Sequence, residues 1–215
     1  MNATSTADSK HAQRVPIKVW IDFVCPYCML GEATIAKAAQ GLDIDIEWMP
    51  FELRAYPTPT LRPEDNYLQT AWKNGVYPTA QQLGIDIRLP TVSPQPYTRK
   101  AFLGLQFAAN HGKADAYVDA VLRAFFQKDL DIGETSVLKD IVLELGLAPE
   151  GLDAALSSAV FNDNHDASLR MAQAVGIRAV PSVAVGNRLF SGMPSAELLR
   201  AAILAEAQAA GTTAA

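Results

Sequence analysis

The sequence predicts an α/β fold in which a large all-helical insertion interrupts a small sheet domain. Three stretches carry this prediction: a strand–helix–strand pattern over residues 15–51, helical patterns over residues 97–175, and a hairpin with a final helix over residues 177–207. Apolar residues are continuous or alternate in the first and last stretches, whereas they recur at helical spacing in the middle one. We therefore assign residues 15–54 and 176–210 to one discontinuous sheet domain and residues 55–175 to the insertion.

The first stretch begins with an apolar run. Residues 15–24 are mostly apolar, which is typical of a strand buried on both faces of a sheet. A helical pattern follows over residues 26–40 and stops at Gly41. Residues 44–51 alternate apolar and acidic side chains, as expected for a second strand. A strand, a helix and a strand in this order favour parallel pairing with a right-handed crossover.

The central stretch changes character at about residue 97. Frequent prolines between residues 54 and 96 argue against long regular elements, and only a short helix over residues 64–74 fits there. Beyond it, apolar periodicity and glycine breaks predict helices over residues 97–111, 114–128, 134–145, 149–158 and 162–175. Apolar side chains at helical spacing predict the core of the insertion at Phe102, Leu105, Phe107, Leu122, Phe125 and Phe126.

The final stretch returns to strands. Residues 178–185 and 188–192 contain short apolar runs joined by Gly186-Asn187, which is a strong hairpin signal. Ser195 is suited to cap a last helix that extends to about residue 207. The hairpin and this helix complete the sheet domain that the first stretch begins.

Charge and hydropathy exclude several classes of partner. A net charge of −5 without a basic run argues against nucleic acid or an anionic membrane surface. No stretch approaches the roughly 20 apolar residues that span a bilayer. Residues 1–14 are polar and lack the apolar segment of a secretory signal, so we expect a disordered tail and a cytoplasmic protein. The sequence leaves the oligomeric state open.

Both cysteines of the chain, Cys25 and Cys28, lie in one Cys-Pro-Tyr-Cys motif where the first strand meets the first helix. Two thiols at this spacing can close a disulfide ring, and unpaired N–H groups at a helix start favour a thiolate at Cys25. Pro26 suits the first helical position because its missing N–H would have no partner there. A disulfide scaffold would use more cysteines, so the motif predicts a redox site in a reducing compartment.

A metal site is the alternative interpretation of a Cys-x-x-Cys pair. A closed zinc site takes four ligands, whereas this pair supplies two and the histidines show no ligand spacing. His11 falls in the tail, and we expect His111 and His165 at the surface or at helix ends. We predict no metal site, although a zinc ion or an iron–sulfur cluster shared between two chains stays open.

Several motifs together resemble one known family. They are the CPYC motif after a strand, PFEL at residues 50–53, DIG at residues 131–133, and GIRAVPSVAVGNRLFSG at residues 176–192 before a last helix. In this order they resemble the DsbA-like thioredoxin-fold oxidoreductases, and most closely the FrnE-like subfamily. The resemblance implies a thioredoxin-like fold with a helical insertion domain, a nucleophilic Cys25 and a resolving Cys28. It also implies a cis proline at Pro181, preceded by Val180, that faces the cysteines and binds substrate. From the residues alone, Pro181 is equally well interpreted as an edge-strand proline without function.

The chain departs from the family pattern at two places. The buried acid that the family places six residues before the first cysteine is absent, because Val19 occupies that position. Asp22 is the nearest acid, and it is expected either to transfer protons or to be solvated at the mouth of the strand. The middle residues Pro26 and Tyr27, which tune the redox pair, match glutaredoxins rather than DsbA. A strongly oxidising potential is therefore not expected.

The prediction is a thiol–disulfide oxidoreductase that exchanges disulfides with protein or small thiol substrates and carries no bound cofactor beyond its redox-active disulfide. Disulfide-containing or thiol proteins are the expected partners, and glutathione is a candidate co-substrate. One alternative is a glutathione-dependent isomerase or transferase related to the kappa-class glutathione transferases, which typically place serine where Cys25 stands. A second is a redox-independent holdase or binding module with an apolar cleft that contains Trp48, Phe51, Tyr56, Trp72 and Tyr77.

Overall fold

The computed structural model of the protein describes residues 14–213, with side chains described through residue 210. The tail expected at residues 1–14 lies outside this range except for Arg14. The Arg14 guanidinium forms an ion pair with Asp43 at 3.1 Å, so this residue is tied to the loop before the second strand.

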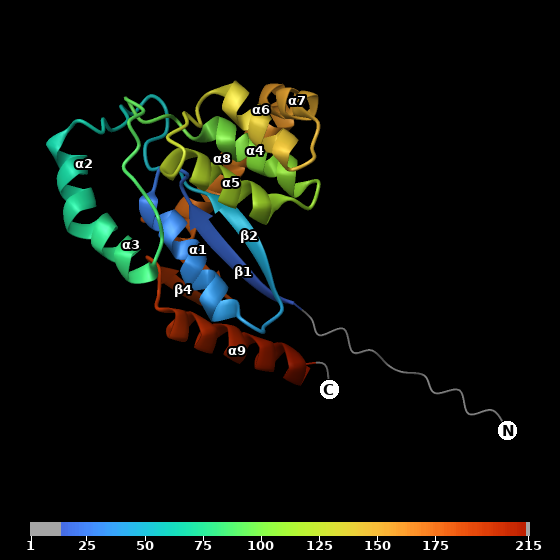
Figure 1. Cartoon of the computed structure of the whole chain (residues 1–215). Helices are drawn as coiled ribbons and strands as arrows, with labels where there is room; N and C mark the ends of the chain where they lie inside the picture. Colours follow the sequence, from blue (N-terminus) through green and yellow to red (C-terminus); the bar gives the residue numbers. More distant parts are fainter. Residues whose placement is uncertain (1–13, 214–215) are drawn as a thin grey trace.

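Within residues 14–213, four strands form one sheet in the order β2-β1-β3-β4 (Figure 1). They are β1 Val15–Ile21, β2 Ile44–Pro50, β3 Ser182–Val185 and β4 Arg188–Ser191. β1 and β2 are parallel, whereas β3 pairs antiparallel with both β1 and β4. The parallel pair needs a crossover, which the intervening helix supplies. The predicted strand–helix–strand unit and the predicted hairpin are both confirmed.

Helices fill the chain between and after the strands. The crossover helix is α1 Pro26–Ala39, and the last helix is α9 Ala196–Thr213. The helices inserted between β2 and β3 are α2 Asn66–Ala71, α3 Tyr77–Leu83, α4 Arg99–Ala109, α5 Ala114–Phe126, α6 Thr135–Glu144, α7 Pro149–Ser157 and α8 Ala159–Ala174. This arrangement is an α/β thioredoxin-like fold with a helical insertion, as predicted. The domain boundaries given above stay a prediction.

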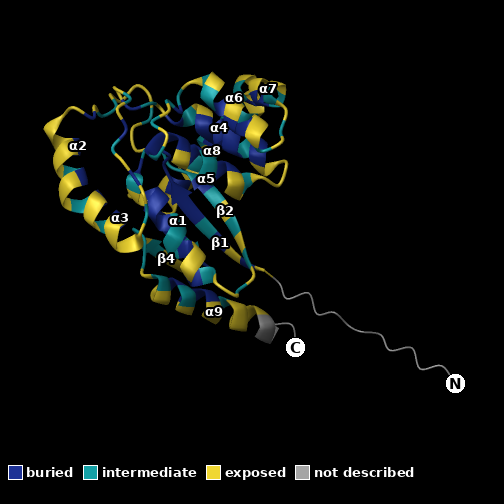
Figure 2. Cartoon of the chain, viewed as in Figure 1, coloured by how far each residue is buried: buried dark blue, intermediate teal, exposed yellow. Residues whose placement is uncertain are grey.

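The two faces of the sheet are covered by different helices. Side chains alternate along β1, so that Ile17 and Val19 join the main core with α1 and α9, while Trp20 packs with Met49 against the end of α8. Figure 2 shows buried residues concentrated in β1 and α1, whereas α2, α3 and α9 carry many exposed residues. The main core also contains residues of α4, α5 and α6, so it continues from the sheet into the insertion.

The helical part of the proline-rich region is longer than predicted. The sequence indicates one short helix over residues 64–74, but α2 continues through a π-helical turn, Trp72–Val76, directly into α3. In this turn the Tyr77 N–H donates to the Trp72 carbonyl, five residues earlier. The wider turn lies immediately before Pro78, which has no N–H to donate. The π-helical turn therefore lets a proline enter an otherwise continuous helix.

Two other boundaries differ from the prediction. β1 ends at Ile21 rather than at residue 24, because the chain turns there and the Cys25 N–H donates to the Asp22 carbonyl at 3.0 Å. The last helix continues to Thr213, beyond the predicted end near residue 207. Its predicted cap is confirmed, since the Leu198 N–H donates to the Ser195 hydroxyl oxygen at 3.2 Å.

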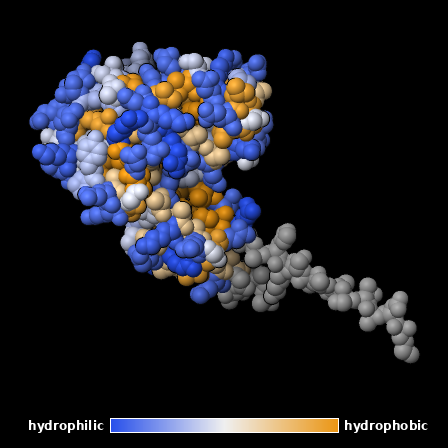
Figure 3. All heavy atoms as spheres, viewed as in Figure 1, coloured by the Kyte–Doolittle hydropathy of each residue, from blue (hydrophilic) through white to orange (hydrophobic). Residues whose placement is uncertain are grey.

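The predicted core of the insertion is confirmed, since all six of its side chains are buried: Phe102, Leu105, Phe107, Leu122, Phe125 and Phe126. Among the described helices, none has the length and apolar character needed to cross a membrane. On the face seen in Figure 3, hydrophobic residues form separate patches between hydrophilic ones.

Candidate redox-active site

The two cysteines lie on the first turn of α1. Cys25 is the residue that precedes the helix, with extended backbone angles of φ −92° and ψ 112°, and Pro26 occupies the first helical position. The Cys28 N–H donates to the Cys25 carbonyl at 3.0 Å, which closes the turn. Residues three apart in a helix lie on the same side, so the motif brings the two thiols together.

The two sulfurs have different surroundings. Cys25 borders a cavity of about 280 Å³, called here the front cavity, although only 6% of the residue is exposed. Cys28 is 2% exposed, and its Sγ accepts a hydrogen bond from the Asp22 N–H at 3.4 Å. Burial, and then the neighbouring Cys25 thiol, raise the pKa of Cys28 well above its usual value. Cys25 is therefore the sulfur next to open space, and Cys28 holds its proton in the interior.

Pro181 lies beside Cys25, at the start of the strand that neighbours β1. The Val180–Pro181 peptide bond is cis, and the Cys25 thiol donates to the Val180 carbonyl at 3.4 Å. Pro181 directly precedes β3, which lies between β1 and β4. It is therefore not an edge-strand proline, and the structure brings Val180 and Pro181, far away in the sequence, next to the Cys25 thiol.

Asp22 is buried, so the expectation that it is solvated at the mouth of the strand is wrong. Only 1% of the residue is exposed, and its Oδ2 accepts a hydrogen bond from the Leu53 N–H at 2.7 Å. Burial raises the pKa of Asp22 to about 7, and the negative charge of Glu52 adds to this, whereas hydrogen bonds from Leu53 and Thr98 oppose it. Asp22 therefore gains or loses a proton near neutral pH, close to the Cys28 sulfur.

The surfaces beside Cys25 are mainly apolar. The front cavity is walled by α2, the π-helical turn and the loops after β2, with Leu61, Leu68, Trp72 and Val76 as apolar contacts and Arg54 as a cation. A second groove of about 620 Å³, the Pro181 groove, lies between α1 and the segment that leads into α9. Tyr27 borders both and is 40% exposed. A substrate that reaches Cys25 would thus meet apolar walls on either side of Tyr27.

A protein-family model described as a DSBA-like thioredoxin domain matches residues 16–204 of the chain. The protein belongs to this family. It is also 38% identical over 191 residues to YwbO of Bacillus subtilis, which is described as uncharacterized, and the match covers 88% of this chain and 96% of that protein.

Solved structures of DsbA-like and related proteins share the fold. A probable DsbA oxidoreductase of Streptomyces coelicolor matches with a TM-score of 0.75 and 22% identity, over 90% of each chain. A 2-hydroxychromene-2-carboxylate isomerase matches with a TM-score of 0.72 and 19% identity, over 93% of this chain and 98% of that one. The cytosolic disulfide reductase DsbM of Pseudomonas aeruginosa, solved with GSH, matches with a TM-score of 0.65 and 18% identity, over 94% and 100%.

In this DsbA-like protein, Asp22→Asn is expected to raise the free energy of unfolding at neutral and higher pH. Folded Asp22 keeps its proton up to about pH 7, whereas an unfolded aspartate loses it near pH 3.8. Between these pH values only the unfolded state releases the proton, so the free energy of unfolding falls as the pH rises. The asparagine removes this loss of stability, which is up to about 4 kcal/mol above pH 7, and its side-chain oxygen can still accept from Leu53.

The measurement is urea unfolding at several pH values on both sides of this window. The gain from Asp22→Asn should grow from about pH 4 to about pH 7 and then level off. The matched control is the same substitution at the exposed Asp140. A gain that does not change with pH would show that Asp22 is not held in its protonated form.

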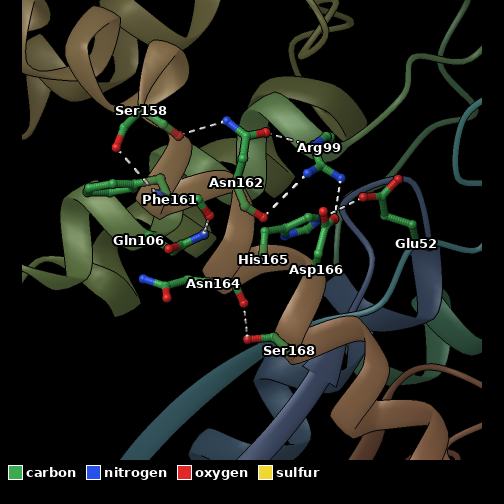
Figure 4. A network of polar contacts seen from close by, with 10 residues as sticks. All are labelled: Glu52, Arg99, Gln106, Ser158, Phe161, Asn162, Asn164, His165, Asp166 and Ser168. Carbon is green, nitrogen blue, oxygen red and sulfur yellow. Dashed lines mark hydrogen bonds and ion pairs between the residues drawn. The ribbon is translucent and has the colours of Figure 1, made fainter.

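Sequence reasoning missed a buried acid–base pair behind Asp22. His165 was expected at the surface or at a helix end, but it lies inside α8 and is 1% exposed, so that expectation is wrong. Its Nε2 lies 2.5 Å from Glu52 Oε1 (Figure 4). One signal was present in the sequence: Asp22 and Glu52 follow neighbouring parallel strands, whose carboxyl ends meet at one edge of the sheet. The His165 partner had no such signal, because it comes from the insertion.

Other predicted features are not gathered at the site. Trp72 borders the front cavity, whereas Trp48 lies on β2 and donates its indole N–H to Asp115 at 2.7 Å. The aromatic residues considered for a holdase therefore do not line one cleft. His111 lies at the end of α4, with Nδ1 2.8 Å from the Phe107 carbonyl, as expected. Among the described residues, no group of three or more His, Cys, Asp or Glu side chains is arranged to hold a metal ion.

Proposed function

We propose that this DsbA-like protein is a thiol–disulfide oxidoreductase in which Cys25 is the nucleophile and Cys28 the resolving cysteine. The observation that carries the proposal is the asymmetry of the two sulfurs: Cys25 borders the front cavity at a helix start, while Cys28 is enclosed and holds its proton. The CPYC, PFEL and hairpin motifs further support a place in the FrnE-like subfamily.

The proposed reaction has two exchanges. The Cys25 thiolate attacks one sulfur of a substrate disulfide, and the other substrate sulfur leaves with the bonding electron pair and takes a proton. Cys28 then loses its proton and attacks Cys25 Sγ, which releases the second substrate thiol and leaves a Cys25–Cys28 disulfide. The substrate disulfide is reduced to two thiols and the protein dithiol is oxidised. With the protein disulfide as the starting form, the same steps run in reverse.

The surfaces near Cys25 favour a substrate segment that is extended and partly apolar. We propose that such a segment of a disulfide-containing or thiol protein lies against Val180 and Pro181 and pairs with their backbone, as in strand addition. The apolar walls of the Pro181 groove would hold its side chains.

A small thiol such as glutathione is a second candidate substrate for the same cysteine. The front cavity, at about 280 Å³, is near the lower end of the range for small-molecule sites, and Arg54 offers a cation for a carboxylate. The fold shared with a disulfide reductase solved with GSH agrees with this. The fold is also shared with an isomerase, but a complete CPYC motif favours disulfide exchange over isomerase or transferase chemistry.

We further propose that the protein works in the cytoplasm and uses its redox-active disulfide without a bound cofactor. Both cysteines belong to one motif, which agrees with a reducing compartment. In that setting the pair would act as a reductase or isomerase.

A glutathione redox titration of the Cys25–Cys28 pair tests this assignment. With Pro26 and Tyr27 between the cysteines, the midpoint potential is expected between about −200 and −270 mV, the range of glutaredoxins and thioredoxin. The oxidised fraction can be followed by mass spectrometry after the free thiols are alkylated. A potential near −120 mV, which is typical of DsbA, would contradict the reductase assignment.

A further inference from the structure

Tyr27 lies where the two openings beside Cys25 meet. Among the described residues it alone lines both the front cavity and the Pro181 groove, and 40% of it is exposed. Cys25 lines the front cavity, while its thiol donates to the carbonyl of Val180, a residue of the Pro181 groove. The reactive sulfur therefore lies between the two openings, beside Tyr27.

The helical segment opposite Tyr27 divides at the same point. α2 and the π-helical turn line the front cavity as far as Val76, whereas α3 lines the Pro181 groove from Thr79 onward. Gly75 lies at this boundary, and a Cβ added there would lie 2.5 Å from the Tyr27 hydroxyl oxygen. The Tyr27 side chain thus reaches from α1 to the π-helical turn and closes the gap between the two openings.

The approach of Tyr27 explains why residue 75 is glycine. Gly75 belongs to a helical turn and its φ is not positive, so the backbone conformation does not require glycine. Its carbonyl accepts a hydrogen bond from the Thr79 hydroxyl at 2.9 Å, which ties it to the next turn. A glycine inside a helix costs about 1 kcal/mol relative to alanine. What the glycine provides here is space for the Tyr27 hydroxyl.

The two openings differ in size and in charge. The front cavity has a volume of about 280 Å³, and its charged groups are Asp22, which keeps its proton up to about pH 7, and Arg54, which donates to a neutral carbonyl, that of Pro59. The Pro181 groove has about 620 Å³, and its charged residues Lys37 and Glu197 pair with each other at 3.4 Å. The front cavity therefore suits a small molecule with a carboxylate, and the groove suits an uncharged extended segment.

We propose that Tyr27, placed against Gly75, is a partition that gives Cys25 two separate substrate sites. The front cavity receives a small disulfide that carries a carboxylate, such as glutathione disulfide, and the Tyr27 ring is one of its walls. A protein segment approaches along the Pro181 groove, and the same ring keeps it out of the front cavity. This inference rests on the proposed function, because both substrates react at Cys25. Tyr27 determines specificity, and Gly75 is a positioning residue that acts through it.

Glutathione disulfide undergoes the same two exchanges as a protein disulfide. The Cys25 thiolate bonds to one glutathione sulfur, and the other glutathione leaves with the bonding electron pair and takes a proton. Cys28 then loses its proton and attacks Cys25 Sγ, which releases the second glutathione as a thiol once it is protonated. One glutathione disulfide is reduced to two thiols, and the protein dithiol is oxidised.

The test compares oxidation of the reduced protein by glutathione disulfide and by insulin in separate reactions. Samples are quenched with acid and alkylated, and mass spectrometry gives a second-order rate constant for each substrate. The readout is the ratio of the glutathione disulfide constant to the insulin constant, because a change in the reactivity of Cys25 alters both constants alike. In Tyr27→Ala this ratio should fall about tenfold, since the smaller site loses an aromatic wall while the larger groove keeps its other walls. A ratio that stays the same or rises would overturn the partition.

Variants of Gly75 test the contact itself. In Gly75→Ala the added methyl group displaces the Tyr27 hydroxyl and moves the ring out of the wall, so the ratio should fall as in Tyr27→Ala. In Gly75→Ala/Tyr27→Phe the hydroxyl is gone and the methyl lies 3.9 Å from the ring carbon Cζ, an ordinary van der Waals distance, so the ratio should return to that of Tyr27→Phe. Asn74→Ala, at an exposed position of the same turn, is the matched control and should keep the original ratio. A fall that Tyr27→Phe does not reverse would overturn the role of the Gly75 contact.

The Pro181 groove provides the reciprocal variant. Met193 lines this groove and not the front cavity, so Met193→Ala should slow the reaction with insulin and raise the ratio. Circular dichroism establishes that each variant is folded, and if Gly75→Ala is not, Tyr27→Ala and Met193→Ala decide. Ratios that are unchanged in both of these variants would overturn the partition alone. If neither disulfide oxidises the unaltered protein, the proposed function fails and the partition with it.

Discussion

Replacing Cys25 with serine is expected to abolish disulfide turnover. Serine keeps the size of the side chain but cannot form a disulfide, and Cys28 cannot replace it because it is 2% exposed and keeps its proton. The rate of insulin reduction should fall to the uncatalysed level, at least about a thousandfold below the unaltered protein.

The fold should survive this substitution, because the Cys25 thiol donates one long hydrogen bond, to the Val180 carbonyl at 3.4 Å, and the backbone hydrogen bonds of the residue are unchanged. Ala36→Ser, at an exposed position of the same helix, is the matched control and should keep full turnover. Turnover that persists in Cys25→Ser but is lost in the double cysteine variant would reverse the proposed order of attack. Suppression of the aggregation of an unfolded protein that persists without either cysteine would instead favour a holdase.

Replacing Cys28 with serine is expected to convert a transient mixed disulfide into a stable one. Cys25 still attacks, but no second thiol is placed within the site to expel the substrate, so the adduct accumulates. Nearly one substrate per chain should remain attached on a non-reducing gel, compared with almost none for the unaltered protein. Mass spectrometry should place the bond at Cys25.

Two comparisons make the trapping result specific. Dithiothreitol should release the substrate completely, which identifies the link as a disulfide. The Cys25→Ser/Cys28→Ser variant should trap nothing, because the attacking sulfur is gone. If Cys28→Ser yields no adduct with any protein or glutathione disulfide, the two-step exchange is not the reaction of this site.

The core of the site was predictable because its signals are local. The Cys25–Cys28 spacing, Pro26 at the first helical position and the apolar strand before them are adjacent in the sequence, and each has a direct physical meaning. The elements were equally predictable where apolar periodicity or a turn signal is strong, as in α5 and the hairpin. The stretch before α4 was misjudged because a π-helical turn before Pro78 lets the helix continue, and the sequence rules for proline predict a break there.

The environment of the site was less predictable than its members. Asp22 was visible as an acid after the strand, but its hydrogen-bond partners Leu53 and Thr98 come from two other segments of the chain. His165 looked like a surface histidine, since nothing in the sequence of α8 indicates that Glu52 will be its partner. Their separation of 113 positions is closed only when the insertion packs on the sheet.

By itself, the sequence determined the fold class and the Cys25–Cys28 pair at the start of the first helix, since these depend on short-range spacing and on the order of the elements. The tertiary structure decided which sulfur borders open space, that Asp22 is buried with a raised pKa, and that a Glu52–His165 pair lies behind it. These properties follow from desolvation and from charges brought together over long distances in the chain. No periodicity or motif reports such effects, because they depend on what surrounds a side chain rather than on what it is.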